Sequence, residues 1–277
     1  MIAVIVPAHN EQADICACLR ALVRASRCAH LQGEAVLLVV VLDTCTDGTG
    51  DMARHMGAQT VAVFARNVGV ARAAGAELAI DAGARWLAFT DADTLVAPDW
   101  LSTQLALGHD AVCGTVAVLD WGSYGARMRA HYDATYNDSD GHHHIHGANL
   151  GVSAAAYARV GGFPPLASSE DVALVQALED VGASIAWSAA PRVVTRERGC
   201  NLVEAPVWMW HWGNPDDSRI PWHRLRSLPL DPATQQQKQD ALAAHASQLG
   251  ARGLTTGPVL GPAIVTRSRR SNEYFFV

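Results

Sequence analysis

The sequence lacks the features that mark several common classes of protein. Its formal net charge of −6 comes without a basic stripe interleaved with aromatic side chains, so no nucleic-acid partner is expected. The longest apolar run, AVLLVVVL, is far shorter than the roughly 18 to 20 residues of a membrane-spanning helix. The opening residues, MIAVIVPAHNE, reach polar side chains too early for a secretory signal peptide. Neither a transmembrane segment nor a leader is therefore expected.

Cysteine is sparse and follows no pattern. The six cysteines are scattered along the chain, and no two of them form a CxxC pair. This distribution favours reduced thiols and a cytoplasmic location, with peripheral membrane contact left open. Because 49% of the 277 residues are apolar, the chain can bury the core of one large α/β domain or of two small ones.

The first half of the chain alternates between apolar strands and helices. Strands are expected at Ile2–Ala8, Ala35–Asp43, Thr60–Ala65 and Arg85–Asp91, and helices at Asp14–Ala25, Asp51–Ala58 and Asn67–Ala84. This order predicts parallel β-α-β units in a sheet that is covered on both faces. Ligands of such sheets bind at the carboxyl ends of the strands, and each expected strand ends in polar residues. That edge of the sheet is the expected site.

The second half is less regular. Strands are expected near 110–120 and on either side of Pro191, and helices at 124–138 and 168–183, the latter capped by Ser168 or Ser169. A histidine-rich loop, GHHHIHGAN, lies between them and suggests either an incidental loop or a Zn²⁺ or Ni²⁺ site. Beyond Gly199 the composition changes to a segment rich in Trp and Pro.

Two acids flank Ala92 where the fourth expected strand ends. In an extended backbone the side chains of Asp91 and Asp93 point the same way. Such a pair can hold a divalent cation, or one acid can hold the cation and the other a sugar hydroxyl. Mg²⁺ and Mn²⁺ prefer oxygen ligands and are often completed by substrate phosphates. The alternative is a solvated loop without a ligand.

Six motifs occur in one order along the chain. They are VIVPAHNE, VVVLDTCTDGT, RNVGVARAAGAELA, LAFTDADTLVAPDWL, GANLGVSAAAYARVGGF and SSEDVALVQAL. Together, over roughly Ile2 to Arg198, they resemble the family-2 glycosyltransferases of the GT-A fold. The resemblance implies a Rossmann-like α/β domain at 1–199 whose mixed, mainly parallel sheet is flanked by helices. Its nucleotide-binding half would span 1–110 and its acceptor half 111–199, with a divergent extension at 200–277 that is either a lid or partly disordered.

The resemblance also implies the substrates and the residues that bind them. The enzyme would move a sugar from a nucleoside-diphosphate sugar, of the UDP or GDP type, to an acceptor hydroxyl. Residues implied in nucleotide and donor binding are Pro7, Ala8, Glu11, Asp43, Asn67, Gly69, Arg72, Asp91, Ala92, Gly147 and Asn149. Arg72 would pair with the diphosphate or with an acid of the site. The alternative for these segments is an ordinary polar turn and an ordinary packed helix.

Metal and catalytic residues follow from the same resemblance. Asp93 would bind Mn²⁺ or Mg²⁺ between the two phosphates, with His211 as the best-placed further ligand. The pair Glu170 and Asp171 would supply the general base, with Asp171 favoured, for an inverting single displacement. Acids in the first turn of a helix also simply stabilise its dipole, which is the alternative reading. His144 or His146 would contact the acceptor.

Three rival functions remain open from the sequence. One is a retaining glycosyltransferase similar to the mannosylglycerate and glucosylphosphoglycerate synthases. Another is a sugar-1-phosphate nucleotidyltransferase, although VPAHNEQAD lacks the Gly, Lys and Arg of its phosphate loop. The third is a sugar-nucleotide-binding protein without catalysis. A homodimer is compatible with all of them.

Overall fold

The computed structural model describes residues 1–118, 129, 130, 132, 134–166, 168–195, 225–232, 234–236 and 272–276. The chain divides into two compact units, Met1–Arg198 and Gly199–Val277. In the second unit, strand β9 (Leu225–Pro229) pairs with the antiparallel strand β10 (Asn272–Phe276). The predicted metal ligand His211 lies outside the described residues.

The first unit contains one sheet and the helices that cover it. The strands are β1 (Ile2–Ala8), β2 (Val36–Asp43), β3 (Gln59–Val63), β4 (Trp86–Phe89), β5 (Thr94–Val96), β6 (Ala111–Val118), β7 (Leu150–Ser153) and β8 (Ile185–Thr195). The helices are α1 (Ile15–Ser26), η1 (Ala29–Leu31), α2 (Thr49–His55), α3 (Val68–Asp81), α4 (Trp100–Ala106), α6 (Ala154–Arg159) and α7 (Glu170–Asp180). In the described part of the chain, no helix is long and apolar enough to cross a membrane.

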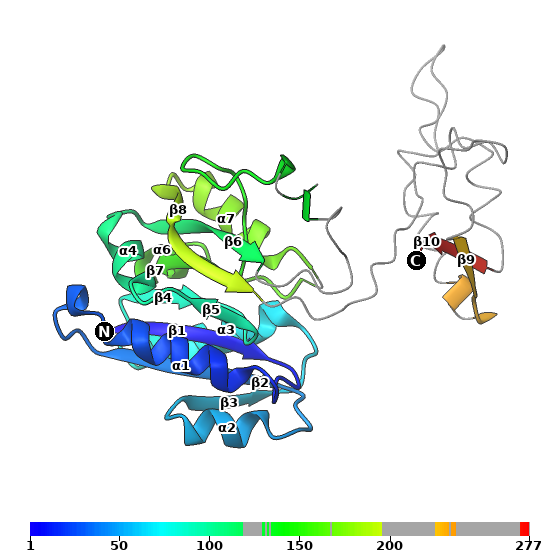
Figure 1. Ribbon diagram of the computed structural model, residues 1–277, viewed down its shortest axis with the longest axis horizontal. Coiled ribbons are helices and arrows are strands. Elements are labelled where there is room, and N and C mark those ends of the chain that lie inside the picture. The colour runs from blue at the N-terminus through cyan, green and yellow to red at the C-terminus, as the bar shows by residue number, and fades with distance from the viewer. Residues whose placement is uncertain are drawn as a thin grey trace, which may run out of the picture. The chain divides into compact units, whose positions relative to one another are not determined.

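The eight strands form a mixed sheet in the order β3-β2-β1-β4-β7-β6-β8-β5 (Figure 1). Strands β3, β2, β1 and β4 run parallel to one another. Strand β7 is antiparallel to β4 and β6, while β6 and β8 are parallel. Strand order changes direction at β1, so β1 and β4 leave a crevice at their carboxyl ends. The predicted mixed, mainly parallel α/β fold is confirmed.

Both faces of the sheet are buried, as the continuous apolar strands require. Ile2, Val4 and Val6 of β1 pack on one face in a cluster with α1 and α4. Ala3 and Ile5 pack on the other face with α3 and α7. Helix α3 comes unusually close, because a Cβ atom at Gly75 would lie 2.5 Å from Cγ2 of Ile5. This close approach brings the residues at the start of α3 against the carboxyl edge of the sheet.

Two local expectations are wrong. Strand β4 ends at Phe89, so Asp91 and Asp93 lie in a turn closed by the Thr94 N–H donating to the Asp91 carbonyl. It is therefore this turn, and not an extended strand, that brings both residues to the cavity. Strand β8 continues through Pro191, where its pairing with β6 shifts register and needs no ladder donor. Ser169 stands at the N-cap of α7 as expected, although its side chain makes no capping hydrogen bond.

Candidate active site

A cavity of about 1060 Å³ lies at the carboxyl ends of the strands. Its wall includes the end of β2, the loops after β1, β3 and β4 and the start of α3. The ends of β6 and β8, residues of the 132–148 segment and the start of α7 complete the lining. The predicted residues that line it are Pro7, Ala8, Glu11, Asp43, Asn67, Arg72, Asp91, Ala92, Asp93, Gly147, Glu170 and Asp171. Residues up to 164 positions apart in the chain therefore share one cavity, at the edge that the sequence indicates.

Asp43 ends β2 and holds the loop that follows β3. Its Oδ1 atom accepts hydrogen bonds from the backbone N–H groups of Ala65 and Arg66, at 2.9 and 2.8 Å, and Oδ2 accepts one from Asn67 at 2.7 Å. Burial alone would raise the pKa of Asp43, but the backbone hydrogen bonds outweigh it and lower the pKa. Asp43 is therefore ionised and braces this wall of the cavity.

Asn67 joins the start of α3 to the segment before α7. Its Oδ1 atom caps the helix by accepting from the Val70 N–H at 3.0 Å. Its Nδ2 atom donates to the carbonyl of Leu166 at 2.8 Å. Both ends of the side chain are used within the protein, so Asn67 acts on the cavity by fixing two of its wall segments.

Arg72 pairs with two acids of the site. Its Nη2 atom lies 2.7 Å from Oδ1 of Asp91, and its Nη1 atom contacts Oε1 of Glu170. The side chains of Arg72 and Glu170 are each 5% exposed, whereas that of Asp91 is 40% exposed. The sequence left two kinds of partner open for Arg72, a diphosphate or an acid of the site. In the structure Arg72 pairs with two acids, Asp91 and Glu170.

Asp171 follows Glu170 on α7, and both residues line the cavity. The Oδ2 atom of Asp171 accepts a hydrogen bond of 2.8 Å from the backbone N–H of Gly147. Its Oδ1 atom accepts from the backbone N–H of Val172 at 2.9 Å. Glu170 is buried, whereas Asp171 is partly exposed. Each carboxylate oxygen has two lone pairs, so a partly exposed carboxylate with one donor on each oxygen can still accept a proton from a hydroxyl group in the cavity.

Gly69 and Asn149 do not line the cavity. A Cβ atom at Gly69 would lie 2.8 Å from the Pro164 carbonyl, so this glycine lets α3 approach the segment before α7. Asn149 is fully buried and donates to the carbonyls of Thr115 and Pro191. Its Oδ1 atom accepts from Nε1 of Trp100 at 2.8 Å. Both residues support the wall from behind, because a buried amide must satisfy its polar atoms within the protein.

Aromatic side chains form a stacked column beside the cavity, and its two tyrosines are not among the predicted site residues. Tyr132 stacks on Tyr136 at 4.5 Å between ring centroids, and Tyr136 stacks on His144 at 4.2 Å. The hydroxyl group of Tyr136 lies 3.0 Å from Nε2 of His146. Tyr132, Tyr136 and His146 line the cavity. The i, i+4 spacing of the two tyrosines in an expected helix was the available signal.

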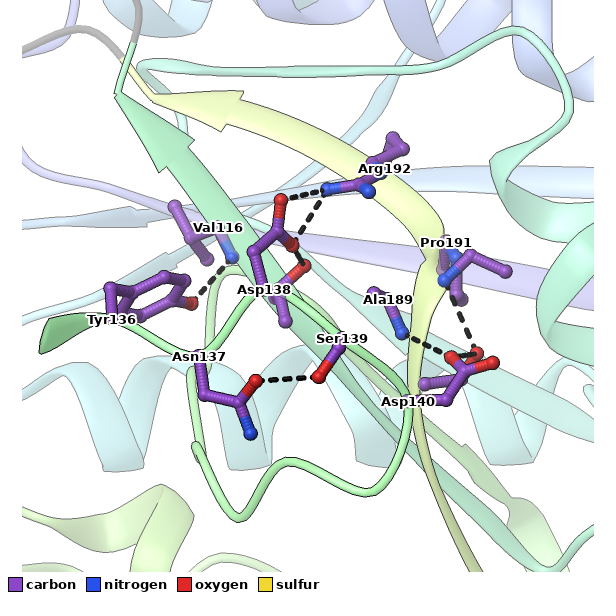
Figure 2. A network of polar contacts seen from close by, with 12 residues as sticks. Val116, Tyr136, Asn137, Asp138, Ser139, Asp140, Ala189, Pro191 and Arg192 are labelled. Atoms are coloured by element: carbon purple, nitrogen blue, oxygen red, sulfur yellow. Dashed lines mark hydrogen bonds and ion pairs between the residues drawn. The ribbon is translucent and has the colours of Figure 1, made fainter. Parts of the chain in front are cut away.

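Polar contacts fix the loop between this column and the sheet (Figure 2). Asp138 pairs with Nη1 of Arg192 on β8 and accepts from the hydroxyl of Thr115 on β6. Asp140 accepts from the N–H of Ala189 at 2.9 Å. The Val116 N–H donates to the Tyr136 hydroxyl at 2.9 Å. The histidine-rich loop is thus tied to β6 and β8, which places His146 at the cavity.

Oxygen ligands for a cation are present in the cavity, but the described residues alone do not complete a coordination shell. Asp91 and Asp93 both line it, and their carboxylates suit Mg²⁺ or Mn²⁺. Among the residues that the structure describes, no group of three or more His, Cys, Asp or Glu side chains could hold a metal ion. The rings of His142 and His144 stack at 5.5 Å instead of converging on a point. The residues fit a cation that is shared with a substrate's phosphates.

Comparisons with known proteins identify the family. The model of glycosyl transferase family 2 matches residues 3–159, which is more than half of the chain. No curated protein sequence is significantly similar to the chain.

Solved structures share the fold at low sequence identity. S. aureus TarS 1–349, in complex with UDP-GlcNAc, is 16% identical with a TM-score of 0.54, and the match covers 76% of this chain and 63% of that chain. Glucosyl-3-phosphoglycerate synthase from Mycobacterium tuberculosis, in complex with Mn²⁺, UDP and glucosyl-3-phosphoglycerate, is 19% identical with a TM-score of 0.50 and 72% coverage of both chains. GalNAc-T7 with UDP, GalNAc and Mn²⁺ is 12% identical with a TM-score of 0.54, over 72% of this chain and 44% of that one. The chain therefore spans less than two thirds of TarS 1–349.

Proposed function

The chain belongs to glycosyl transferase family 2, and we propose that it transfers a sugar from a nucleoside-diphosphate sugar to an acceptor hydroxyl group. One observation carries the proposal: Asp43, Asp93 and Asp171 line a single cavity at the carboxyl edge of the sheet. The three carboxylates suit three tasks, which are holding a base, holding a cation and accepting a proton. The structures of TarS, the mycobacterial synthase and GalNAc-T7 contain UDP or a UDP-sugar.

The nucleotide is expected beside Pro7, Ala8, Glu11 and Asp43. Within the described contacts, Oδ1 of Asp43 accepts three hydrogen bonds, from Thr44, Ala65 and Arg66, while Oδ2 accepts one from Asn67. A carboxylate oxygen offers two lone pairs, so Oδ2 retains the capacity to accept the ring N–H of a base. UDP and GDP both carry such an N–H group, so both donor types remain candidates.

A divalent cation, Mn²⁺ or Mg²⁺, is the proposed cofactor, held by Asp93 with the donor's phosphates. When bound, it would act as a Lewis acid that neutralises charge on the leaving nucleoside diphosphate. Asp91 is held by Arg72 through Oδ1, which leaves Oδ2 for the ribose or the donor sugar. His211 remains a candidate further ligand, outside the described residues.

Asp171 is the proposed general base. It would remove the proton from the acceptor hydroxyl as the oxygen attacks the anomeric carbon, while the bond to the diphosphate breaks on the opposite face. This single displacement inverts the anomeric centre and needs no covalent intermediate. NMR of the first-formed product tests this point, because a retaining enzyme would give the opposite anomer.

Binding of nucleotides provides the first experiment. The purified chain is heated with UDP, GDP or dTDP, each with and without Mn²⁺, and its melting temperature is recorded. A ligand present at about 100 times its Kd stabilises the folded state by roughly 2.7 kcal/mol. The proposal predicts stabilisation by one nucleotide that increases with Mn²⁺. No shift with any nucleotide would contradict it, and a binding protein without catalysis would show the shift but no transfer. A cytoplasmic location and a homodimer remain predictions.

A further inference from the structure

The side chain of Arg72 joins two parts of the cavity wall that are far apart in the sequence. Its guanidinium group bonds to Asp91, in the turn after β4, and to Glu170, at the start of α7. Asp91 is 19 positions away in the chain and Glu170 is 98 positions away. The buried guanidinium group of Arg72 therefore connects Asp91, which is expected at the donor, to the helix that carries Asp171.

Two neighbours fix the plane of this guanidinium group. A Cβ atom at Gly147 would lie 2.4 Å from Cζ of Arg72, so the bare backbone of Gly147 packs directly on it. Cζ also lies 5.9 Å from the centroid of the Phe163 ring. The planar fork of arginine fits this slot and reaches both acids, whereas the single ammonium group of lysine cannot bond to both in the same way.

A buried ion pair of this kind is a poor source of stability. Removing two charges from water costs about as much as their attraction returns, and apolar replacements are often neutral or stabilising. The Arg72–Glu170 pair, with both side chains 5% exposed, is of this type. We therefore expect this ion pair to position side chains in the wall of the cavity and to add little to the free energy of unfolding.

We propose that Arg72 is a positioning residue that, through Glu170, fixes the rotation of the first turn of α7 and so aims Asp171 into the cavity; this inference rests on the proposed function. Consecutive helical residues point about 100° apart. With Glu170 held inward by Arg72, Asp171 is turned toward Gly147 and the cavity. Ser169, at φ 61°, sets the abrupt start of the helix. Release of Glu170 would free this turn to rotate.

The first test needs no turnover. The Gly147 amide donates to Asp171, so its proton resonance in ¹⁵N-glycine-labelled protein follows the ionisation of that carboxyl group during a pH titration. Asp171→Asn assigns the effect. We expect Arg72→Lys and Glu170→Gln each to abolish most of the Gly147 titration. The matched control is Arg85→Lys, which changes another arginine that forks a carboxylate, that of Glu34. Retention of the wild-type titration in both variants would overturn the proposal.

The second test divides binding from turnover. Glu170→Gln leaves the Arg72–Asp91 pair in place. It is expected to lower kcat about 100-fold, as a displacement near 1 Å can do, and to leave the Kd for UDP with Mn²⁺ unchanged. The double variant with Arg72→Lys should lose little more kcat, because the two residues act as a unit. A raised Kd with unchanged kcat in Glu170→Gln would instead show a role in nucleotide binding and overturn the proposal.

The two proposals fail in different ways. Absence of transfer by the wild-type chain with every donor would reject the proposed function, while an Arg72-dependent Gly147 titration would still support the positioning role. If Arg72→Lys fails to fold, Glu170→Gln replaces it, since the amide keeps the shape of the side chain and removes only the charge. A Glu170→Gln variant with wild-type titration and kcat then overturns the inference.

Discussion

The backbone N–H of Gly147 donates a hydrogen bond of 2.8 Å to Oδ2 of Asp171. This contact joins the loop before β7 to the first turn of α7 and fixes one carboxylate oxygen. A side chain at Gly147 would have no space, because the guanidinium group of Arg72 packs directly against this glycine. The relationship gives the acid a defined place in the cavity wall, and the consequences can be measured.

Asp171→Asn should abolish transfer and preserve nucleotide binding. An amide keeps the size of the side chain and can still accept from Gly147, but it cannot take a proton from an acceptor hydroxyl. We expect kcat to fall by about 10²- to 10⁴-fold, the usual contribution of a general base. Initial rates and calorimetric titration with UDP measure the two effects. The control is Asp180→Asn, an exposed acid at the end of the same helix, and equal losses in both variants would refute the assignment.

Asp93→Asn should remove the effect of Mn²⁺ on nucleotide affinity. The carboxylate is the proposed protein ligand of the cation, and an amide oxygen carries no full charge with which to hold it. In the wild type, UDP should bind more tightly with Mn²⁺ than without it, and the variant should bind UDP equally weakly in both. Calorimetry measures both affinities. Asp99→Asn, an exposed acid six residues on, is the control and should keep the wild-type difference.

Asp43→Asn should destabilise the fold. The amide presents its NH₂ group where the carboxylate now accepts a backbone hydrogen bond, which leaves a partly buried N–H without its partner. The expected loss in the free energy of unfolding is about 1–3 kcal/mol near pH 7. Urea titration measures this loss, with the exposed Asp81→Asn variant as control.

The same substitution has a defined pH dependence. Since the folded-state pKa of Asp43 is lowered, its contribution is fully present above the unfolded pKa of about 3.9 and disappears as pH falls through the folded value. The stability difference between wild type and Asp43→Asn should therefore shrink at acidic pH. A difference that is constant from pH 7 into this range would contradict the origin assigned to the shift.

Two histidines of the histidine-rich loop, His142 and His146, should destabilise the fold in mild acid. Burial lowers the pKa of His142 and of His146, and the nearby His144 lowers both further. The unfolded chain then binds protons that the folded chain does not, so stability is full above the unfolded pKa of about 6.5 and falls below it. The double variant His142→Gln/His146→Gln should weaken this dependence. Urea titration between pH 7 and pH 5 measures it, and the exposed His30→Gln variant should keep the wild-type slope.

Local patterns predicted the sheet well because its strands are continuous apolar runs. They also predicted which strand ends meet, since parallel strands present their carboxyl ends together. Local patterns failed where the path of the backbone depends on contacts with residues far away in the sequence. Asp91 lies in a turn between β4 and the three-residue strand β5, which is too short to show a period. Strand β8 passes through Pro191 only because a shift in its pairing with β6 accommodates the proline.

Most of the site residues that the sequence indicated line the cavity. The sequence did not indicate how their side chains are oriented. The sequence gives Glu170 and Asp171 as neighbours on a helix but does not show which of them is buried and which is partly exposed to the cavity. That choice depends on Arg72, 98 positions away from Glu170. Likewise Asn149 belongs to a motif that lines the site in the resemblance, yet its amide is consumed by Trp100, Thr115 and Pro191. Long-range partners of buried polar groups decide these cases.

The loops at the cavity contain unusual backbone conformations. Of the five non-glycine residues with positive φ in the described part of the chain, four lie next to or in the cavity wall: Asn10, Thr44, Arg66 and Ser169. A left-handed conformation costs a residue such as Thr roughly 1–2 kcal/mol. Glycine at position 44 would relieve that cost and loosen the strand end that holds Asp43. Substitutions to glycine at such positions would therefore increase the stability of the protein. Each of them would also make the backbone around the cavity less rigid.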